Sequence, residues 1–367
     1  MHGSPLLVSM LASLAHGHGG LHQSTALEFG PAGPILETTY GVIRLADDGE
    51  WSWICEEVSG VAGDGWTFSV GPDGRMWFTG IGGANTSTDH CSWAALEGAP
   101  AERFITSIVP DATRPGVVWA TTGNGGVPNP LLRADDGGLS FADGPVLDDD
   151  ARLRRLAVAP DGRIWVQGMI DSTVWVWTSP DGADWRGTSV VEVDRGVELV
   201  DVGPDGSAWV RTRTSVGDGL YRVSPGLDVA LIYETGSSID GVSAGPGRDE
   251  VWLGGRDLVL QGTQDGGGTW MTAEDAPSVG CLVRHGGVRW MCSDNWVDGA
   301  ALSQVTVGGE LGPWTPVLWF GDVQRVEPCA AGTATAQECG PLWAALDPQS
   351  GMDLEDSPAD GVAADSG

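Results

Sequence analysis

The sequence predicts an all-β protein, a single seven-bladed β-propeller whose blades are four-stranded antiparallel sheets. Two periodic sets of aromatic residues, about 44 residues apart within each set, carry this prediction. The first set comprises Trp77, Trp119, Trp165, Trp209, Trp252, Trp290 and Trp343. The second set follows about half a period later and comprises Trp53, Trp93, Phe141, Trp185, a degenerate member near Leu227, Trp270 and Trp314. Such a period is typical of propeller blades.

The clearest repeat unit, residues 103–147, contains four short apolar and β-branched runs separated by turn residues. The first run is 104–109, and a turn through Pro110-Asp111 leads to the second run, 117–121. A loop rich in Gly, Asn and Pro precedes the third run, and an Asp-Gly turn precedes the fourth. No stretch sustains the 3.6-residue period of a helix, so each unit is expected to hold four strands.

The turn before the second aromatic residue has a chemistry of its own. Its best copy runs from Thr263 to Trp270, and a second good copy runs from Ala134 to Phe141. The Asp carboxylate can accept backbone N–H groups of the turn, while Gly adopts a positive φ at little cost. A Ser or Thr hydroxyl adds a further local hydrogen bond. These residues predict a tight hairpin between the third and fourth strands.

The pattern Ser/Thr-x-Asp-x-Gly-x-Thr-Trp resembles the Asp-box, or BNR, repeat of the sialidase-like and sortilin-like propellers. The resemblance extends over about residues 35–345, and residues 39–57 also look like the first blade of uncharacterised secreted bacterial propeller proteins. It implies Asp-box turns between the third and fourth strands. The family contains both hydrolases and binding scaffolds, so the resemblance implies a fold more strongly than an activity.

Ring closure is expected to combine the two ends of the chain in one blade. Residues 323–326 and 341–344 fit a first and a second strand, and residues 42–45 and 51–54 fit a third and a fourth. Residues 35–38 compete for the second-strand place, which leaves a three-plus-one closure as the alternative.

Composition restricts the partners. The 367 residues contain 50 acidic and 19 basic side chains, and the formal charge is −31. All the basic residues are Arg. This charge disfavours nucleic acid, whose binding depends on phosphate neutralisation, and it disfavours anionic membrane surfaces. We expect one propeller domain over residues 24–346, monomeric, with no nucleic-acid partner and no membrane insertion.

The two ends of the chain predict export. Residues 1–17 carry a short apolar core followed by small residues, as in a signal peptide, and are too short to span a membrane. Residues 347–367 are acidic, poor in large apolar side chains and expected to be disordered. The protein is therefore expected to be secreted or to stay in the periplasm or cell envelope.

Six cysteines, with no Cys-x-x-Cys pair, are expected to form disulfides in an oxidising compartment. A Gly-Gly hairpin places Cys281 opposite Cys292, within disulfide range. Cys329 with Cys339 would close a loop, and Cys55 with Cys91 would then link the first two blades. This is one of 15 possible pairings.

A sialidase-like glycoside hydrolase is the alternative function. Such enzymes need an Arg triad, a Tyr–Glu nucleophile pair and an acid/base Asp, and they use six blades. Only Tyr40, Tyr221 and Tyr233 could serve as nucleophile, and Tyr233 adjoins Glu234, so in a strand the two would face opposite sides. The run Asp148-Asp149-Asp150 lacks the EF-hand spacing, and no metal or cofactor is expected.

The favoured function is a non-catalytic exported scaffold that binds an unidentified protein or glycan. In propellers the loops between second and third strands lie on the face opposite the Asp-box turns. Candidate binding residues in these loops are Asn124, Arg213 and Trp296. Trp296 belongs to neither periodic set, so it has no required place inside a blade. The alternative for all three is an ordinary polar loop.

Overall fold

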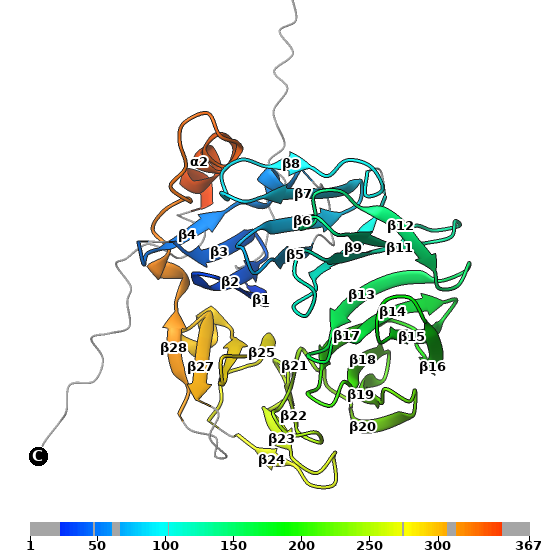
Figure 1. Cartoon of the computed structure of the whole chain (residues 1–367). Coiled ribbons are helices and arrows are strands. Elements are labelled where there is room, and N and C mark those ends of the chain that lie inside the picture. Colours follow the sequence, from blue (N-terminus) through cyan, green and yellow to red (C-terminus); the bar gives the residue numbers. More distant parts are fainter. Residues whose placement is uncertain are drawn as a thin grey trace, which may run out of the picture.

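The computed structural model describes residues 23–346, apart from residues 47, 61–66, 102, 274 and 307–312. In this part of the chain seven four-stranded antiparallel sheets form a ring (Figure 1). The fold is a seven-bladed β-propeller, as the periodic tryptophans predict. The expected signal peptide and acidic tail lie outside the described residues, and the domain limits 24–346 remain a prediction.

Each blade takes four consecutive strands. Blade 1 contains β1 (Ser24–Gly30), β2 (Gly33–Thr38), β3 (Gly41–Leu45) and β4 (Trp51–Ile54). Blade 2 contains β5 (Thr67–Val70), β6 (Met76–Gly80), β7 (Gly83–Ser87) and β8 (Ala94–Ala95). Blade 3 contains β9 (Ile105–Pro110), β10 (Val118–Thr122), β11 (Pro130–Ala134) and β12 (Ala142–Val146), and blade 4 contains β13 (Arg152–Val158), β14 (Ile164–Ile170), β15 (Thr173–Ser179) and β16 (Arg186–Glu192).

Blade 5 contains β17 (Gly196–Val202), β18 (Ala208–Thr214), β19 (Gly217–Val223) and β20 (Val229–Thr235). Blade 6 contains β21 (Gly241–Ala244), β22 (Val251–Gly254), β23 (Gln261–Thr263) and β24 (Met271–Thr272). Blade 7 contains β25 (Cys281–His285), β26 (Val288–Cys292), β27 (Leu302–Thr306) and β28 (Thr315–Leu318). The helices are η1 (Glu56–Ser59), α1 (Asn295–Asp298), η2 (Phe320–Asp322) and α2 (Ala334–Leu346).

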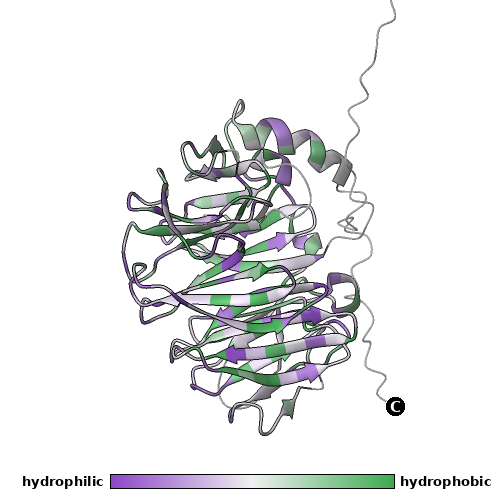
Figure 2. Ribbon diagram, turned by 90° about the vertical axis from the view of Figure 1, so that its right-hand side faces the viewer, coloured by the Kyte–Doolittle hydropathy of each residue, from purple (hydrophilic) through white to green (hydrophobic). Residues whose placement is uncertain are grey.

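The first strands of the blades surround the axis of the ring, and the fourth strands lie at its rim (Figure 1). Each first strand contacts the first strand of the next blade, including β25 against β1, which closes the circle. Hydrophobic residues are concentrated along the strands, and hydrophilic residues along the loops (Figure 2). The core is therefore distributed between successive blades, because each sheet buries its faces only against its neighbours.

The tryptophans of the first set fill the space between neighbouring blades. Six of its members lie in second strands, and four of them are almost completely buried: Trp77, Trp119, Trp165 and Trp209. The Trp165 indole donates to the carbonyl of Gly206 in the next blade at 2.9 Å. A Cβ at Gly182 would come within 2.6 Å of Trp119, so the turn of blade 4 needs glycine to approach that indole. The period in the sequence thus reflects one packing contact repeated around the ring.

The aspartate turns between third and fourth strands form as their residues predict. Asp265 accepts the N–H of Thr269 at 2.9 Å and the hydroxyls of Thr263 and Thr269 at 2.8 Å. These hydrogen bonds, led by the Thr269 N–H, lower the pKa of Asp265 to about 2. Asp89, Asp136 and Asp181 accept hydrogen bonds in the corresponding turns. These carboxylates act as turn residues.

Ring closure differs from the expectation of a shared blade. Blade 1 takes all four strands from the N-terminal part of the chain, so both the two-plus-two and the three-plus-one closures are wrong. Residues 341–344 lie in α2, which places Trp343 in a helix. Val326 instead forms a parallel bridge with Trp53 on the rim strand β4. The C-terminal segment thus reinforces the outside of blade 1 after the ring is complete.

Three disulfides are present, and two of the expected pairings are wrong. Cys281 pairs with Cys292, directly across β25 and β26, with the Cα atoms 4.8 Å apart. Cys339 pairs with Cys55 rather than with Cys329, and Cys329 pairs with Cys91. The reason is the position of the C-terminal segment, which crosses the rim of blades 1 and 2 and presents one cysteine to each.

Candidate functional site

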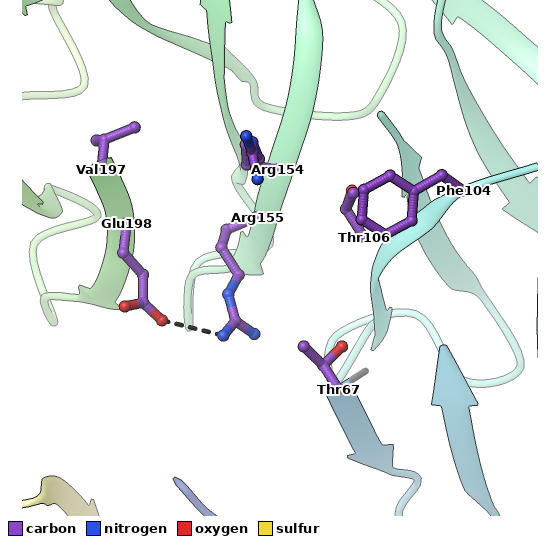
Figure 3. A pocket seen from close by; sticks show the side chains of 7 residues that line it. All are labelled: Thr67, Phe104, Thr106, Arg154, Arg155, Val197 and Glu198. Atoms are coloured by element: carbon purple, nitrogen blue, oxygen red, sulfur yellow. Dashed lines mark ion pairs between the residues drawn. The ribbon is translucent and has the colours of Figure 1, made fainter. Parts of the chain in front are cut away.

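A cavity of about 240 Å³ lies at the axis of the ring, and we call it the axial pocket. Its lining comes from the first strands of blades 2 to 5 and from the residue just before β9 (Figure 3). The lining residues are Thr67, Phe104, Thr106, Arg154, Arg155, Val197 and Glu198. They lie near the N-terminal ends of their strands. In an antiparallel meander these ends lie on the same face as the loops between second and third strands. The pocket therefore opens on the face for which the sequence predicts binding.

A β-bulge brings two consecutive arginines to this pocket. In the pairing of β13 with β14, Leu153 lies opposite Gly168 and Arg155 lies opposite Gln167, so Arg154 is an extra residue without a partner. Neighbouring residues of a regular strand point to opposite faces, and a bulge re-aims them. Both guanidinium groups therefore reach the axial pocket, where Arg154 is exposed and Arg155 is half-buried.

Glu198 lies between two guanidinium groups. Its Oε1 lies 3.0 Å from Nη2 of Arg155, and its other oxygen pairs with Arg211 (Figure 3 shows the first pair). Burial raises the pKa of Glu198, but Arg155 and Arg211 outweigh that effect and lower it overall. The carboxylate is thus held in its charged form, and one negative charge is shared by two cations.

Three further carboxyl groups near the axis have raised pKa values. Burial raises the pKa of Glu28 and of Glu37 to about 7, although the charge of Arg155 opposes the shift at both. Burial also raises the pKa of Asp201 to about 6, against the N–H groups of Ala244 and Val202. Near neutral pH these groups are partly protonated, so they only partly compensate the arginine charge around the axis.

The predicted residue Asn124 lies beside the axial pocket without lining it. Its Oδ1 accepts the backbone N–H of Phe104 at 2.8 Å. Asn129 in turn holds the loop, donating to the carbonyls of Asn124 and Ala151 and accepting the Asn124 N–H. Asn124 is therefore placed to position the aromatic wall of the pocket, and its direct contact with a ligand stays a prediction.

The predicted residue Arg213 does not line the axial pocket but forms ion pairs with two aspartates. Its Nη2 is 3.0 Å from Asp240, and its Nε is 3.8 Å from Asp218. Arg213 also contributes to lowering the pKa of Glu198. The structure thus connects Arg213 to the pocket through electrostatics rather than through the lining.

The predicted residue Trp296 lies in α1, in the loop between β26 and β27. Its backbone N–H donates to Asp294, and its ring is partly buried against the core that blade 1 shares with blade 7. Its neighbour Val297 is 79% exposed. The exposed apolar side chain of this loop is therefore the valine, which the sequence did not single out.

Exposed aliphatic residues recur in the loops between second and third strands. Five of the ten exposed large hydrophobic residues in the described part of the chain occupy this one position in different blades: Ile81, Val127, Val216, Val259 and Val297. Each is more than half exposed, and Val216 reaches 84%. These five side chains therefore lie on one face of the ring, one in each of five blades.

The tyrosines required by the hydrolase alternative lie elsewhere. Tyr221 and Tyr233 belong to the outer strands β19 and β20, and Tyr40 lies in the turn after β2. The Tyr233 hydroxyl accepts from Gln261 in blade 6 at 2.8 Å. None of the three lines the axial pocket. Within the described residues no group of His, Cys, Asp and Glu is arranged to hold a metal ion.

The sequence reasoning missed the arginine pair. The run Arg152-Leu153-Arg154-Arg155 reads as an alternating strand with one misplaced charge, and only the bulge places both of the last two in one pocket. The signal that could have drawn attention to this strand was its density of arginine, since three of the 19 arginines lie within four residues. Within the described residues no helix is long and apolar enough to cross a membrane.

Comparison with known proteins identifies the fold and no more. No protein-family model matches the chain, and no curated protein matches it. Solved structures similar to it include virginiamycin B lyase from Staphylococcus aureus, with a TM-score of 0.52, 14% identity and coverage of 73% of this chain and 90% of that one. A catalytically inactive variant of that lyase with quinupristin gives a TM-score of 0.54, 13% identity and coverage of 73% and 91%.

A puromycin hydrolase variant gives a TM-score of 0.53 with 16% identity. The similarity covers 78% of this chain and 52% of the hydrolase, so this chain spans about half of that protein. At these identities the similarity shows the propeller fold, which hosts lyases, hydrolases and binding proteins alike.

Proposed function

We propose that this protein is an exported, non-catalytic propeller that captures a protein or glycan partner on the face carrying the loops between second and third strands. The axial pocket is the observation that carries the proposal. Four blades contribute to it, it opens on that face, and it combines an aromatic wall with charged groups. Such a combination of apolar surface and a few convergent polar groups is typical of binding sites.

Two further observations support the proposal. The exposed aliphatic side chains at five loop tips extend the contact surface outward from the pocket. The three disulfides fit an oxidising compartment outside the cytoplasm, as export requires. Asn124, Arg213 and Trp296 lie on or behind this face, where their replacement is expected to weaken capture.

The test is selection of ligands from a peptide library and a glycan array on the immobilised protein, followed by affinity measurements on variants. The double variant Phe104→Ala/Val297→Ser should lose affinity for selected ligands at least about tenfold, roughly 1.4 kcal/mol. The matched control is Leu139→Ser, which removes an exposed leucine from an aspartate turn on the opposite face. Equal losses in both variants would contradict the proposed face, and turnover of aryl glycosides by the purified protein would contradict the absence of catalysis.

A further inference from the structure

The axial pocket also indicates what kind of ligand group it takes. We infer that it binds an oxyanion, a carboxylate or a phosphate, attached to an apolar group, with Arg154 as the main contact and Arg155 as the second. This inference rests on the proposed function and deepens it. It depends on the pairing state of the two arginines, on the apolar side chains beside them and on the size of the cavity.

Arg154 is a cation with no described carboxylate near it. Thirteen of the 19 arginines form an ion pair in the described part of the chain, and Arg154 is not among them. In a chain with a formal charge of −31, an arginine that lines a pocket and lacks an acidic partner is an exception. The bulge leaves Arg154 without a partner residue on β14, and its exposed side chain lines the pocket.

Arg155 contributes further positive charge. The single carboxylate of Glu198 faces both Arg155 and Arg211, so this group of three is one positive charge in excess. Glu28 and Glu37 also act on Arg155, and with pKa values of about 7 each is about half ionised at neutral pH. Together they offset about this one excess charge, so Arg154 carries the net positive charge of the pocket. The pocket mouth is therefore locally cationic within an acidic protein. A planar guanidinium pairs with carboxylate or phosphate through two parallel hydrogen bonds.

Apolar side chains line the pocket on both sides of the strand that carries the arginines. The Phe104 ring lies across from the strand that carries the arginines, and Val197 lies on the other side of that strand (Figure 3). The hydroxyl of Thr106 already hydrogen-bonds with Thr121 and with the carbonyl of Leu153, so it adds little polarity. The cavity of about 240 Å³ corresponds to about eight water volumes. This is enough for an oxyanion with one aromatic or branched group.

The experiment compares three small probes by calorimetric titration at low ionic strength, where screening is weak. N-acetyl-phenylalanine carries a carboxylate, its amide is the neutral match, and phenyl phosphate tests the other oxyanion. Each is titrated into the wild-type protein, into Arg154→Gln and into Arg248→Gln. Arg248 is the matched control, because it is 71% exposed on a turn between first and second strands, at the opposite face, and its loss changes the net charge equally.

We expect at least one of the two oxyanions to bind at least about fivefold more tightly than the amide, and Arg154→Gln to remove that preference. Arg248→Gln should change the affinity less than twofold, and unchanged near-ultraviolet circular dichroism confirms that each variant is folded. The stronger of the two anionic probes identifies the source as carboxylate or phosphate.

The inference is overturned if neither oxyanion binds more tightly than the amide, if Arg154→Gln leaves the preference unaffected, or if no probe binds. Binding of the amide that is lost in Phe104→Ala would leave the proposed function standing while this inference fails. Catalytic turnover of aryl glycosides would instead remove the proposed function itself.

Discussion

The disulfide between Cys55 and Cys339 should contribute more to stability than the one between Cys281 and Cys292. The first joins residues 284 positions apart and the second joins residues 11 apart. In the chain-entropy description, a cross-link stabilises the native state by restricting the unfolded chain, and the effect grows with the logarithm of the loop length. For isolated loops of these lengths it amounts to about 5.6 and about 2.8 kcal/mol at 25 °C.

The presence of Cys91–Cys329 reduces the first figure. When that bond is intact, the loop closed by Cys55–Cys339 shrinks to the stretches 55–91 and 329–339, about 46 residues in all. The expected contribution is then about 4 kcal/mol, still above that of Cys281–Cys292. The segment before α2 is also anchored to blade 1 by the ion pair of Glu327 with Arg44, at 2.5 Å.

The perturbation is a pair of double variants, Cys55→Ala/Cys339→Ala and Cys281→Ala/Cys292→Ala. Free energies of unfolding come from urea titrations followed by the fluorescence of the 18 tryptophans. The first variant should lose about 4 kcal/mol and the second about 3 kcal/mol. A larger loss in the second variant, or none in the first, would refute the reasoning that the longer loop closed by the C-terminal segment contributes more to stability.

Two further predictions concern carboxylates, the buried Asp111 and the half-buried Glu37. Asp111→Ala should lower the free energy of unfolding, measured in urea titrations, by about 3 kcal/mol. The reason is that the Asp111 carboxylate is fully buried and accepts hydrogen bonds from Thr113, Arg114 and Trp119. A loss under about 1 kcal/mol would show that these donors find other partners. Glu37→Gln should stabilise the protein at pH 8 relative to pH 5 by about 1–3 kcal/mol. The folded-state pKa of about 7 exceeds the unfolded value of 4.5, so the wild-type glutamate loses its stabilising protonation as pH rises through 7. An equal effect of Glu37→Gln at both pH values would contradict the raised pKa.

The periodic tryptophans predicted the fold because their positions reflect a repeated physical need. An indole that fills the space between two blades recurs in the second strands of six blades, so those strands could be derived from spacing alone. Blade 1 has no tryptophan in its second strand β2, so the seven members of the set matched the seven blades only through Trp343. Trp343 continued the series only by coincidence. Its helix packs against blade 1, with its ring 5.8 Å from that of Trp53, and such a long-range contact leaves no local pattern.

The disulfides also differ in how far the sequence predicts them: one pair follows from local structure, and two pairs depend on contacts between distant segments. The pair Cys281–Cys292 follows from hairpin register, which two adjacent glycines determine. The pairs of Cys55 and Cys91 depend on where the C-terminal segment docks, which strand patterns do not encode.

At the candidate site, the proposed binding face followed from blade topology, whereas the residues of the axial pocket did not. The bulge at Arg154 changes the direction of two side chains that simple alternation assigns to opposite faces. The exposed valines were also missed, since single apolar residues in loops are ordinary and gain meaning only when several share one position in different blades.

Hydrogen–deuterium exchange of the protein with a selected ligand bound tests the central claim most directly. Capture at the axial pocket predicts slower exchange in residues 104–106, 152–155 and 196–198, with little change in the aspartate turns around Asp136 and Asp265 on the opposite face. Protection confined to those turns, or to the rim strands β12, β20 and β24, would contradict it.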